Sequence, residues 1–192
     1  MIVDLNSMIY ISIPKTGSNT VNKLRGFEEY NHIKAKTIKK KIGGEFFCQR
    51  GSFCFIRDPN EIIKSWYFYH KNNSRVPKNE GYDFYPETIE EWILRKNFRT
   101  HWQRLTFKLN NPSWDLTNPL FQKKWVCDDK NELIVTNIYS FKNFKTILTK
   151  FYGQNIKAYN SSFSESIDLS EECKKKVEKI FAEDLDLYRS LN

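Results

Sequence analysis

The sequence lacks the features that place a protein in or across a membrane. No apolar run among its 192 residues approaches the length that spans a bilayer, and no charged N-terminal segment is followed by an apolar one. We therefore expect a protein of the cytoplasm or another soluble compartment, without a membrane partner. The chain also contains no internal repeat and no low-complexity tract, so a repeat architecture is not expected.

Cysteines at the spacing of metal ligands are missing too. The four cysteines, Cys48, Cys54, Cys127 and Cys173, form no C-x-x-C pair and have no histidine nearby at ligand spacing. This pattern argues against a zinc site. We expect no bound metal, and we interpret the cysteines as buried, reduced thiols of an intracellular protein.

The composition is that of one folded domain with an excess of positive charge. Hydrophobic residues make up 40% and aromatic residues 16% of the chain, which is long enough for a sheet with helices packed on it. A single domain over residues 1–192 is therefore expected. The formal net charge of +8 favours an anionic partner. Nucleotides, acidic polysaccharides and nucleic acids all meet this description, and charge alone does not choose among them.

Strand-like and helix-like segments alternate along the chain. Expected strands cover residues 8–13, 53–57 and 132–137. Expected helices cover residues 18–25, 33–42, 61–71, 88–95, 98–109, 143–152 and 171–188, and expected irregular segments cover residues 72–86, 110–131 and 155–166. The alternation predicts an α/β protein with a central, mostly parallel sheet covered by helices on both sides.

Particular residues mark where these helices should begin and end. Gly26 is expected to end the first helix, and the Gly43–Gly44 pair is expected to end the second. Asn60 and Ser170 stand at the N-cap positions of the third and the last expected helix. Four consecutive aromatic residues, 66–69, would cover every face of the third helix, so most of them are expected in the core.

The first strand-to-helix turn has the composition of an anion-binding loop. Residues Pro14–Thr20 read P-K-T-G-S-N-T directly after an apolar run. Backbone N–H groups of such a turn, together with the N-terminus of the next helix, can hold a phosphate. The loop of nucleotide triphosphatases, G-x-x-x-x-G-K-S/T, is different because its lysine follows the second glycine. An ordinary turn with a solvated Lys15 is the alternative interpretation.

The second strand-to-helix turn carries an arginine. The sequence F-I-R-D-P spans Phe55–Pro59, and Ser65 follows Arg57 by eight residues on the next expected helix. A guanidinium presents a fork of donors that matches phosphate oxygens, and a hydroxyl on a helix can bind another oxygen. Because ligands bind at the carboxyl edge of open α/β sheets, Lys15 and Arg57 are candidates for one site. Alternatively, Arg57 forms a surface ion pair with Asp58 or Glu61.

Both turns resemble elements of the sulfotransferases that use 3′-phosphoadenosine 5′-phosphosulfate (PAPS). The first is similar to their 5′-phosphosulfate loop, particularly the P-K-T-G form of the carbohydrate sulfotransferases, and the second to their 3′-phosphate element. The resemblance implies a three-layer, P-loop-like fold and PAPS as cofactor, with the nucleotide PAP as product. Carried over by motif, the implied cofactor-binding residues are Lys15, Thr16, Gly17, Ser18, Asn19, Thr20, Arg57 and Ser65.

The resemblance also implies roles in catalysis. Lys15, the backbone N–H groups of the loop and the helix dipole would stabilise the leaving phosphate, so no metal is required. His32 lies between the two cofactor elements, and we expect it to be the base that accepts the acceptor's proton. A structural role for His32 is the alternative. His101, His70, and then Glu28 or Glu29 follow as candidates for the base.

The chain departs from the family pattern at two places. The family often has a second arginine between R-D-P and the serine, where this chain has Ile62. A late strand of the family often ends in R-F/Y-E, where this chain reads Ser140-Phe141-Lys142. Weaker similarity extends over residues 31–32, 100–102, 137–144, 160–162 and 184–188.

Sulfuryl transfer to a hydroxyl or amine of an acceptor is the function that the resemblance implies, with carbohydrate as the acceptor class. An acidic glycan and a small hydroxyl compound are both candidate partners, and nucleic acid is not expected. Recognition of the acceptor is expected in the segments 72–86 and 110–125. Two other functions remain open at this point, a P-loop kinase of small molecules and a non-catalytic protein that binds polyanions or nucleic acid.

Overall fold

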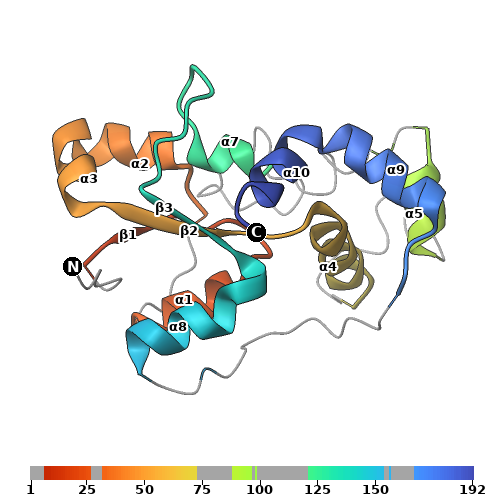
Figure 1. The fold of residues 1–192 in the computed structure, drawn as a ribbon, viewed down its shortest axis with the longest axis horizontal. Coiled ribbons are helices and arrows are strands. Elements are labelled where there is room, and N and C mark those ends of the chain that lie inside the picture. Colours follow the sequence, from red (N-terminus) through yellow and green to blue (C-terminus); the bar gives the residue numbers. More distant parts are fainter. Residues whose placement is uncertain are drawn as a thin grey trace, which may run out of the picture.

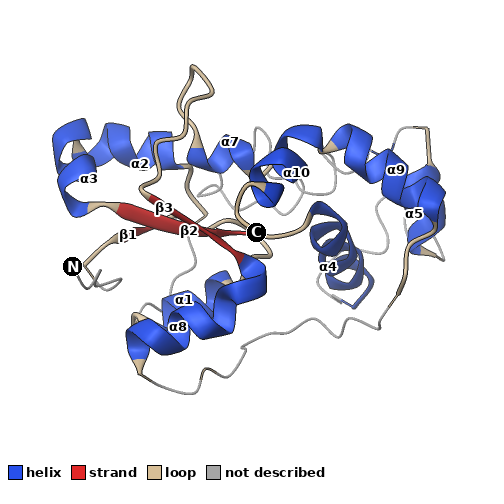
Figure 2. Cartoon of the chain, in the orientation of Figure 1, coloured by secondary structure: helices blue, strands red, loops and turns tan. Residues whose placement is uncertain are grey.

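The structure is a computed structural model that describes residues 7–26, 32–72, 88–96, 98, 121–153, 156 and 167–192. These residues form a mixed α/β arrangement, in which a small parallel sheet of three strands is flanked by helices (Figures 1 and 2). The fold class predicted from the alternation of strands and helices is therefore confirmed at this level.

Strand β2, Ser52–Ile56, lies at the centre of the sheet between β1, Ile9–Tyr10, and β3, Asn137–Ser140. Both pairings are parallel, and Phe53 is opposite Tyr10 on one side and Asn137 on the other. All five residues of β2 are buried, as is typical of a parallel strand covered on both faces. Because the strands are parallel, their carboxyl ends lie at one edge of the sheet.

The helices have the following bounds. They are α1 Ser18–Leu24, α2 Ala35–Ile42, α3 Gly44–Arg50, α4 Pro59–Asn72, α5 Ile89–Leu94, α7 Lys123–Val126, α8 Phe144–Tyr152, α9 Glu171–Ile180 and α10 Ala182–Arg189, with a short 3-10 helix, η1, at Phe141–Asn143.

Alternate side chains of β2 face opposite groups of helices. Phe53 and Phe55 belong to a buried cluster with residues of α1 and α8. Cys54 and Ile56 belong to a second cluster with residues of α2, α3 and α7. Figure 1 shows the two groups of helices on opposite sides of the sheet. The period of two along the strand thus decides which helix each residue contacts.

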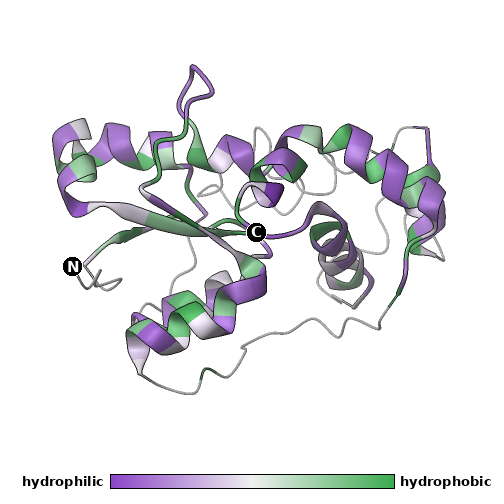
Figure 3. Ribbon diagram, in the orientation of Figure 1, coloured by the Kyte–Doolittle hydropathy of each residue, from purple (hydrophilic) through white to green (hydrophobic). Residues whose placement is uncertain are grey.

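A third cluster forms beyond the carboxyl edge of the sheet, where α4 packs against α5 and α9. Trp66, Tyr67 and Phe68 are buried in it, as the sequence predicted for most of this aromatic run. Helix α5 begins with a capping box between Thr88 and Glu91. Helices α8 and α9 each carry hydrophobic and hydrophilic residues, the pattern of helices that cover a core on one side (Figure 3).

Two predicted strands were placed wrongly at their ends. The first is restricted to Ile9–Tyr10, although the residues up to Ile13 are buried. The third was predicted at 132–137, but the residues that pair with Phe53–Ile56 are Asn137–Ser140. Leu133 forms only an isolated antiparallel bridge with Cys127 and is 51% exposed. Pairing with β2, rather than apolar sequence alone, decides where β3 lies.

Several predicted helix boundaries were also wrong. Helix α4 begins at Pro59, and Asp58 Oδ1 accepts a hydrogen bond of 2.8 Å from the N–H of Asn60, so Asp58 rather than Asn60 is the cap. Proline suits this first helical position because it lacks the N–H that would otherwise be unpaired. Helix α2 ends at Ile42, before Gly43–Gly44, as predicted, but the helix α3 that begins at Gly44 was not predicted. The last helix bends at Phe181, which separates α9 from α10.

The segment 110–131, which was expected to be irregular, contains the short helix α7. The predicted helix over 98–109 lies outside the described residues except for Phe98, which is buried. The predicted loops over 72–86 and 155–166 also lie outside them, apart from Asn72, the last residue of α4, and Ile156. All four cysteines are free thiols, three of them buried as predicted, but Cys48 is exposed.

Within the described part of the chain, no helix is both long and apolar enough to cross a bilayer. The same residues contain no group of three or more His, Cys, Asp or Glu side chains placed to hold a metal ion.

Candidate anion-binding site

The two turns that follow β1 and β2 lie side by side at the carboxyl edge of the sheet. Arg57 comes directly after β2, and its Nη1 donates a hydrogen bond of 3.3 Å to the carbonyl oxygen of Lys15. The structure therefore brings the two motifs together at the edge where parallel sheets bind ligands.

The Lys15 turn is shaped by its own main chain and hydroxyl groups. Lys15 and Gly17 both have positive φ angles, 65° and 81°. The hydroxyls of Thr16 and Ser18 each donate a hydrogen bond of 2.8 Å to the carbonyl oxygen of Ile13. Because both hydroxyls are engaged within the turn, Thr16 and Ser18 would bind an anion through their backbone N–H groups rather than through their side chains.

Gly17 is the one residue of this turn that no other amino acid can replace without strain. A Cβ atom there would lie 2.5 Å from Cζ of Phe144 and 3.1 Å from Cε2 of Phe141. Its φ angle also favours glycine. The first turn of α8 and the η1 segment thus close over the Lys15 turn, a contact that requires a glycine at this point.

The beginning of α1 presents backbone donors. The N–H groups of Thr20 and Val21 donate to the carbonyl oxygen of Gly17 at 3.0 and 3.2 Å. Those of Gly17, Ser18 and Asn19 make no hydrogen bond to any residue that the structure describes. Donors of this kind, at the start of a helix next to a lysine, suit an oxyanion.

The ammonium group of Lys15 is partly withdrawn from water. Its Nζ lies 4.3 Å from the ring centre of Tyr69 and 5.6 Å from that of Trp66, both on α4. Burial, followed by the nearby charge of Arg57, lowers the pKa of Lys15 to about 8. Two cations held together in a partly desolvated place would be stabilised by a bound anion.

The guanidinium of Arg57 has several weak contacts. Its Nη2 lies 3.5 Å from Oε2 of Glu61, and its Cζ lies 5.0 Å from the ring centre of Phe141. Burial lowers the pKa of Arg57, and the Glu61 carboxylate opposes this shift. The ion pair that the alternative interpretation anticipated is therefore present. Glu61 is 43% exposed and also pairs with Lys64, so water and a second cation weaken its hold on Arg57.

Ser65 lies on α4, the helix whose residues Trp66 and Tyr69 contact Lys15. It is buried and stands one helical turn before Tyr69, whose ring contacts the Lys15 ammonium. Ile62, at the position where the resembled family often has an arginine, is buried in the cluster of α4, α5 and α9 instead. The departure from the family pattern is thus accommodated by the core and adds no charge to the site.

His32 is buried behind the Lys15 turn. Its Nδ1 lies 2.7 Å from the carbonyl oxygen of Ser12 and 3.1 Å from the Ser12 hydroxyl. A carbonyl oxygen only accepts, so Nδ1 carries the proton and Nε2 of the neutral ring holds the lone pair. Burial lowers the pKa of His32 to about 4, and the charge of Lys15 contributes to this shift. The ring is therefore neutral at pH 7 with a lone pair on Nε2, and the same burial makes it a weaker base than an exposed histidine.

Some predicted residues cannot be placed in the site. His101, Glu28 and Glu29 lie outside the described residues, and for His70 only its position in α4 is described. Asn19 and Thr20 lie in the first turn of α1, half-buried and buried respectively.

Three residues near the site were missed by the sequence analysis. Phe141 and Phe144 cover the Lys15 turn, and Phe141 also contacts Arg57. Gln122 bonds both backbone polar groups of Arg57 with its side-chain amide, at 2.8 and 2.7 Å. Gln122 has no sequence signal, because it is one polar residue in a stretch without hydrophobic periodicity. The two phenylalanines come soon after a strand, and this position is a sequence signal for packing on the sheet.

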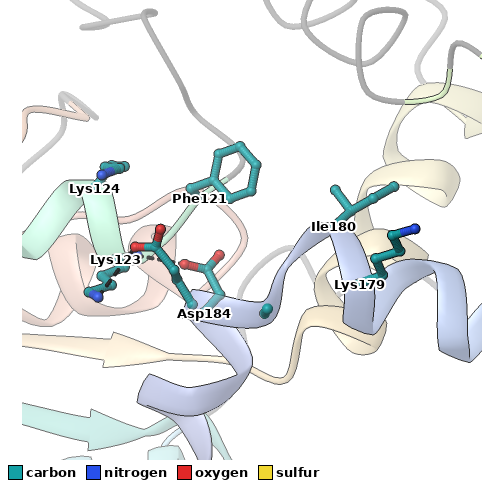
Figure 4. A pocket seen from close by; sticks show the side chains of 8 residues that line it. Phe121, Lys123, Lys124, Lys179, Ile180 and Asp184 are labelled. Carbon is teal, nitrogen blue, oxygen red and sulfur yellow. Dashed lines mark hydrogen bonds and ion pairs between the residues drawn. The ribbon is translucent and has the colours of Figure 1, made fainter.

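A pocket of about 270 Å³ lies elsewhere, between α7 and the bend from α9 to α10, and contains neither Lys15 nor Arg57 (Figure 4). Asp184 lines it, and burial raises the pKa of this carboxyl to about 7. Both of its oxygens accept backbone hydrogen bonds of 2.8 Å, from Gln122 and Lys123. Glu183 pairs with Lys123 at 3.3 Å. The acidic groups of this pocket are thus engaged in holding α7.

The fold and the site together define an α/β protein with a cationic, partly buried site at the carboxyl edge of a parallel sheet. Comparisons of the chain with protein-family models, with curated proteins and with solved structures found no match. Its function must therefore be inferred from the geometry of the site and from the motifs that form it.

Proposed function

We propose that this protein is a sulfotransferase that moves a sulfuryl group from PAPS to a hydroxyl or amine of an acceptor, with carbohydrate as the acceptor class. The observation that carries the proposal is the contact between Arg57 and the Lys15 turn. PAPS has an anionic group at each end of its ribose, and two adjacent cationic turns match that distribution of charge. A three-layer, P-loop-like fold is part of the same proposal, supported by the helices on both sides of the parallel sheet.

The bound cofactor would supply the sulfuryl group, and residues of the chain would accept the proton, stabilise the leaving phosphate and hold the nucleotide. His32 Nε2 would take the proton of the acceptor as the new sulfur–oxygen or sulfur–nitrogen bond forms and the bond to the 5′-phosphate breaks. The Lys15 ammonium and the N–H groups of Gly17, Ser18 and Asn19 would stabilise the charge left on that phosphate. Arg57 and Ser65 would hold the 3′-phosphate.

The test compares binding of PAP with binding of ATP and magnesium by titration calorimetry. We expect the wild-type protein to bind PAP more tightly, and Lys15→Ala to weaken PAP binding at least about tenfold through loss of a charge-assisted contact. Lys40→Ala is the matched control, since Lys40 is an exposed lysine on α2. The affinity of this variant for PAP should stay within about twofold of wild type, because a distant exposed charge is screened.

Two results would overturn the proposal. Preference for ATP with magnesium would favour a small-molecule kinase. Equal losses in both lysine variants, with an affinity that falls steeply as salt is added, would favour a binder of polyanions or nucleic acid. If PAP binds as expected, a screen with labelled PAPS against glycans, phenols and small alcohols identifies the acceptor.

A further inference from the structure

The side chain of Gln122 continues the hydrogen-bond pattern of the sheet beyond its last residue. Strand β2 ends at Ile56, which is opposite Ser140 of β3. At the next residue, Arg57, none of the strands that the structure describes is paired, and the Gln122 amide takes that place. Its Oε1 accepts from Arg57 N–H at 2.8 Å, and its Nε2 donates to the Arg57 carbonyl oxygen at 2.7 Å. A primary amide thus acts as a peptide group of a neighbouring strand would.

Gln122 is itself fixed by the C-terminal part of the chain. It is buried, and its backbone N–H donates to Oδ2 of Asp184 at the start of α10. The other oxygen of Asp184 accepts from Lys123 N–H, so one carboxylate caps the beginning of α7. A buried carboxylate with two backbone donors holds this segment in one position.

The main chain of Arg57 is held tightly, whereas its side chain is not. The two bonds to Gln122 measure 2.8 and 2.7 Å. The guanidinium contacts are longer, 3.3 Å to the Lys15 carbonyl oxygen and 3.5 Å to Glu61. The direction in which the guanidinium points therefore depends on where the main chain of Arg57 is anchored.

From this contrast we infer that Gln122, supported by Asp184, is a positioning residue that aims Arg57 at the anion. The inference rests on the proposed function, because the anion is taken to be the 3′-phosphate of the nucleotide. Fixing the backbone in advance lowers the ordering cost that binding would otherwise include.

The first experiment measures amide hydrogen exchange in the ligand-free protein. Gln122→Met keeps the length of the side chain and removes both hydrogen bonds, so exchange at the Arg57 amide should speed up at least about tenfold. Exchange at Phe55 should not change. Ser140→Ala is the matched control, because it removes another side-chain link to the C-terminus, the partly buried 3.0 Å bond to Asn192, without removing a bond of Arg57.

The second experiment measures the affinity for PAP of the same variants. We expect Gln122→Met to bind about tenfold more weakly, and Ser140→Ala to bind like wild type. Asp184→Asn keeps the shape but removes the charge and one of the two oxygens that accept backbone hydrogen bonds. It should show smaller losses of the same kind, and it serves if Gln122→Met does not fold.

The outcomes separate the two proposals. Faster exchange at Arg57 with unchanged PAP affinity would overturn the positioning role, and so would unchanged exchange. Faster exchange in a protein whose wild type does not bind PAP would overturn the sulfotransferase proposal, while the anchoring of Arg57 by Gln122 would stand.

Discussion

The turn after β1 and the turn after β2 deliver one cation each to the same place, but they are built differently. The Lys15 turn is defined from within, by positive φ angles at Lys15 and Gly17 and by hydroxyl bonds to Ile13. The Arg57 turn is defined from outside, by the Gln122 amide.

This difference separates what each turn contributes. The first offers backbone N–H groups and an ammonium, so its binding depends on the path of the main chain. The second offers a planar fork, so its binding depends on one side chain and on the anchor behind it. Substitutions chosen at each turn test the comparison directly.

The largest expected effect is at His32, next to the Lys15 turn. His32→Ala should lower the rate of sulfuryl transfer by about 10² to 10⁴-fold, the usual contribution of a general base, and leave PAP affinity within about twofold. His32→Asn keeps a donor for the Ser12 carbonyl oxygen but has no basic nitrogen, so it should be as inactive as the alanine variant. Transfer assays with labelled PAPS and calorimetry measure the two quantities. Full activity in either variant would remove His32 from the chemistry.

The next effect tests whether the main-chain conformation of the Lys15 turn requires a glycine at position 17. Gly17→Ala should reduce the free energy of unfolding by about 2–4 kcal/mol, because positive φ strain adds to overlap with Phe144. Gly153→Ala is the matched control, since Gly153 also has a positive φ, 65°, but has no atom within 4 Å of the added Cβ. It should cost about 1 kcal/mol. Urea unfolding gives both values, and equal losses would show that Phe144 does not constrain the turn.

A smaller effect tests whether the Arg57 turn depends on geometry rather than charge. Arg57→Lys keeps the charge but loses the fork, and PAP affinity should fall about tenfold. Arg50→Lys on α3 is the control, because Arg50 also lies over an aromatic ring, Phe46, and also donates to a carbonyl oxygen, that of Ser7. Its affinity should not change. If Arg57→Lys also binds normally, the two turns do not differ in this respect.

The smallest effect comes from the ionisation of Lys15. Its pKa is lowered to about 8, so the ammonium is charged below that pH and loses its proton above it. PAP affinity should therefore fall several-fold as the pH rises from about 7 to about 9, measured by calorimetry. Lys15→Arg should flatten this dependence, since a guanidinium keeps its proton in this range. A wild-type profile without a change near pH 8 would contradict the assignment.

The sequence was sufficient to predict the α/β class and the position of both turns. Each turn follows an apolar run that ends at a residue unable to continue it, Pro14 in the first case and Arg57 with Asp58-Pro59 in the second. These are local signals, and the strands and helices on either side agree with them. The convergence of the turns followed from the parallel pairing of neighbouring strands.

The features that the sequence did not predict depend on contacts between distant segments. β3 is displaced toward residues 137–140 because they are the ones that pair with β2, although the preceding residues are also apolar. The last helix bends at Phe181 because Val177 and Phe181 pack in the cluster of α4, while Leu187 packs in the cluster beside the sheet. A straight helix would not place these residues in both clusters. The bend was not predicted, because hydrophobic periodicity continues through it.

The link between the two turns uses the carbonyl oxygen of Lys15, not its side chain. Every amino acid provides that oxygen, so the bond to Arg57 does not depend on the side chain of residue 15, although the positive φ angle of 65° there disfavours β-branched residues and proline. Substitutions by unbranched residues at this single position would then vary charge, length and polarity while the bond to Arg57 is kept. Such a series offers a direct way to learn what sort of anion the molecule prefers.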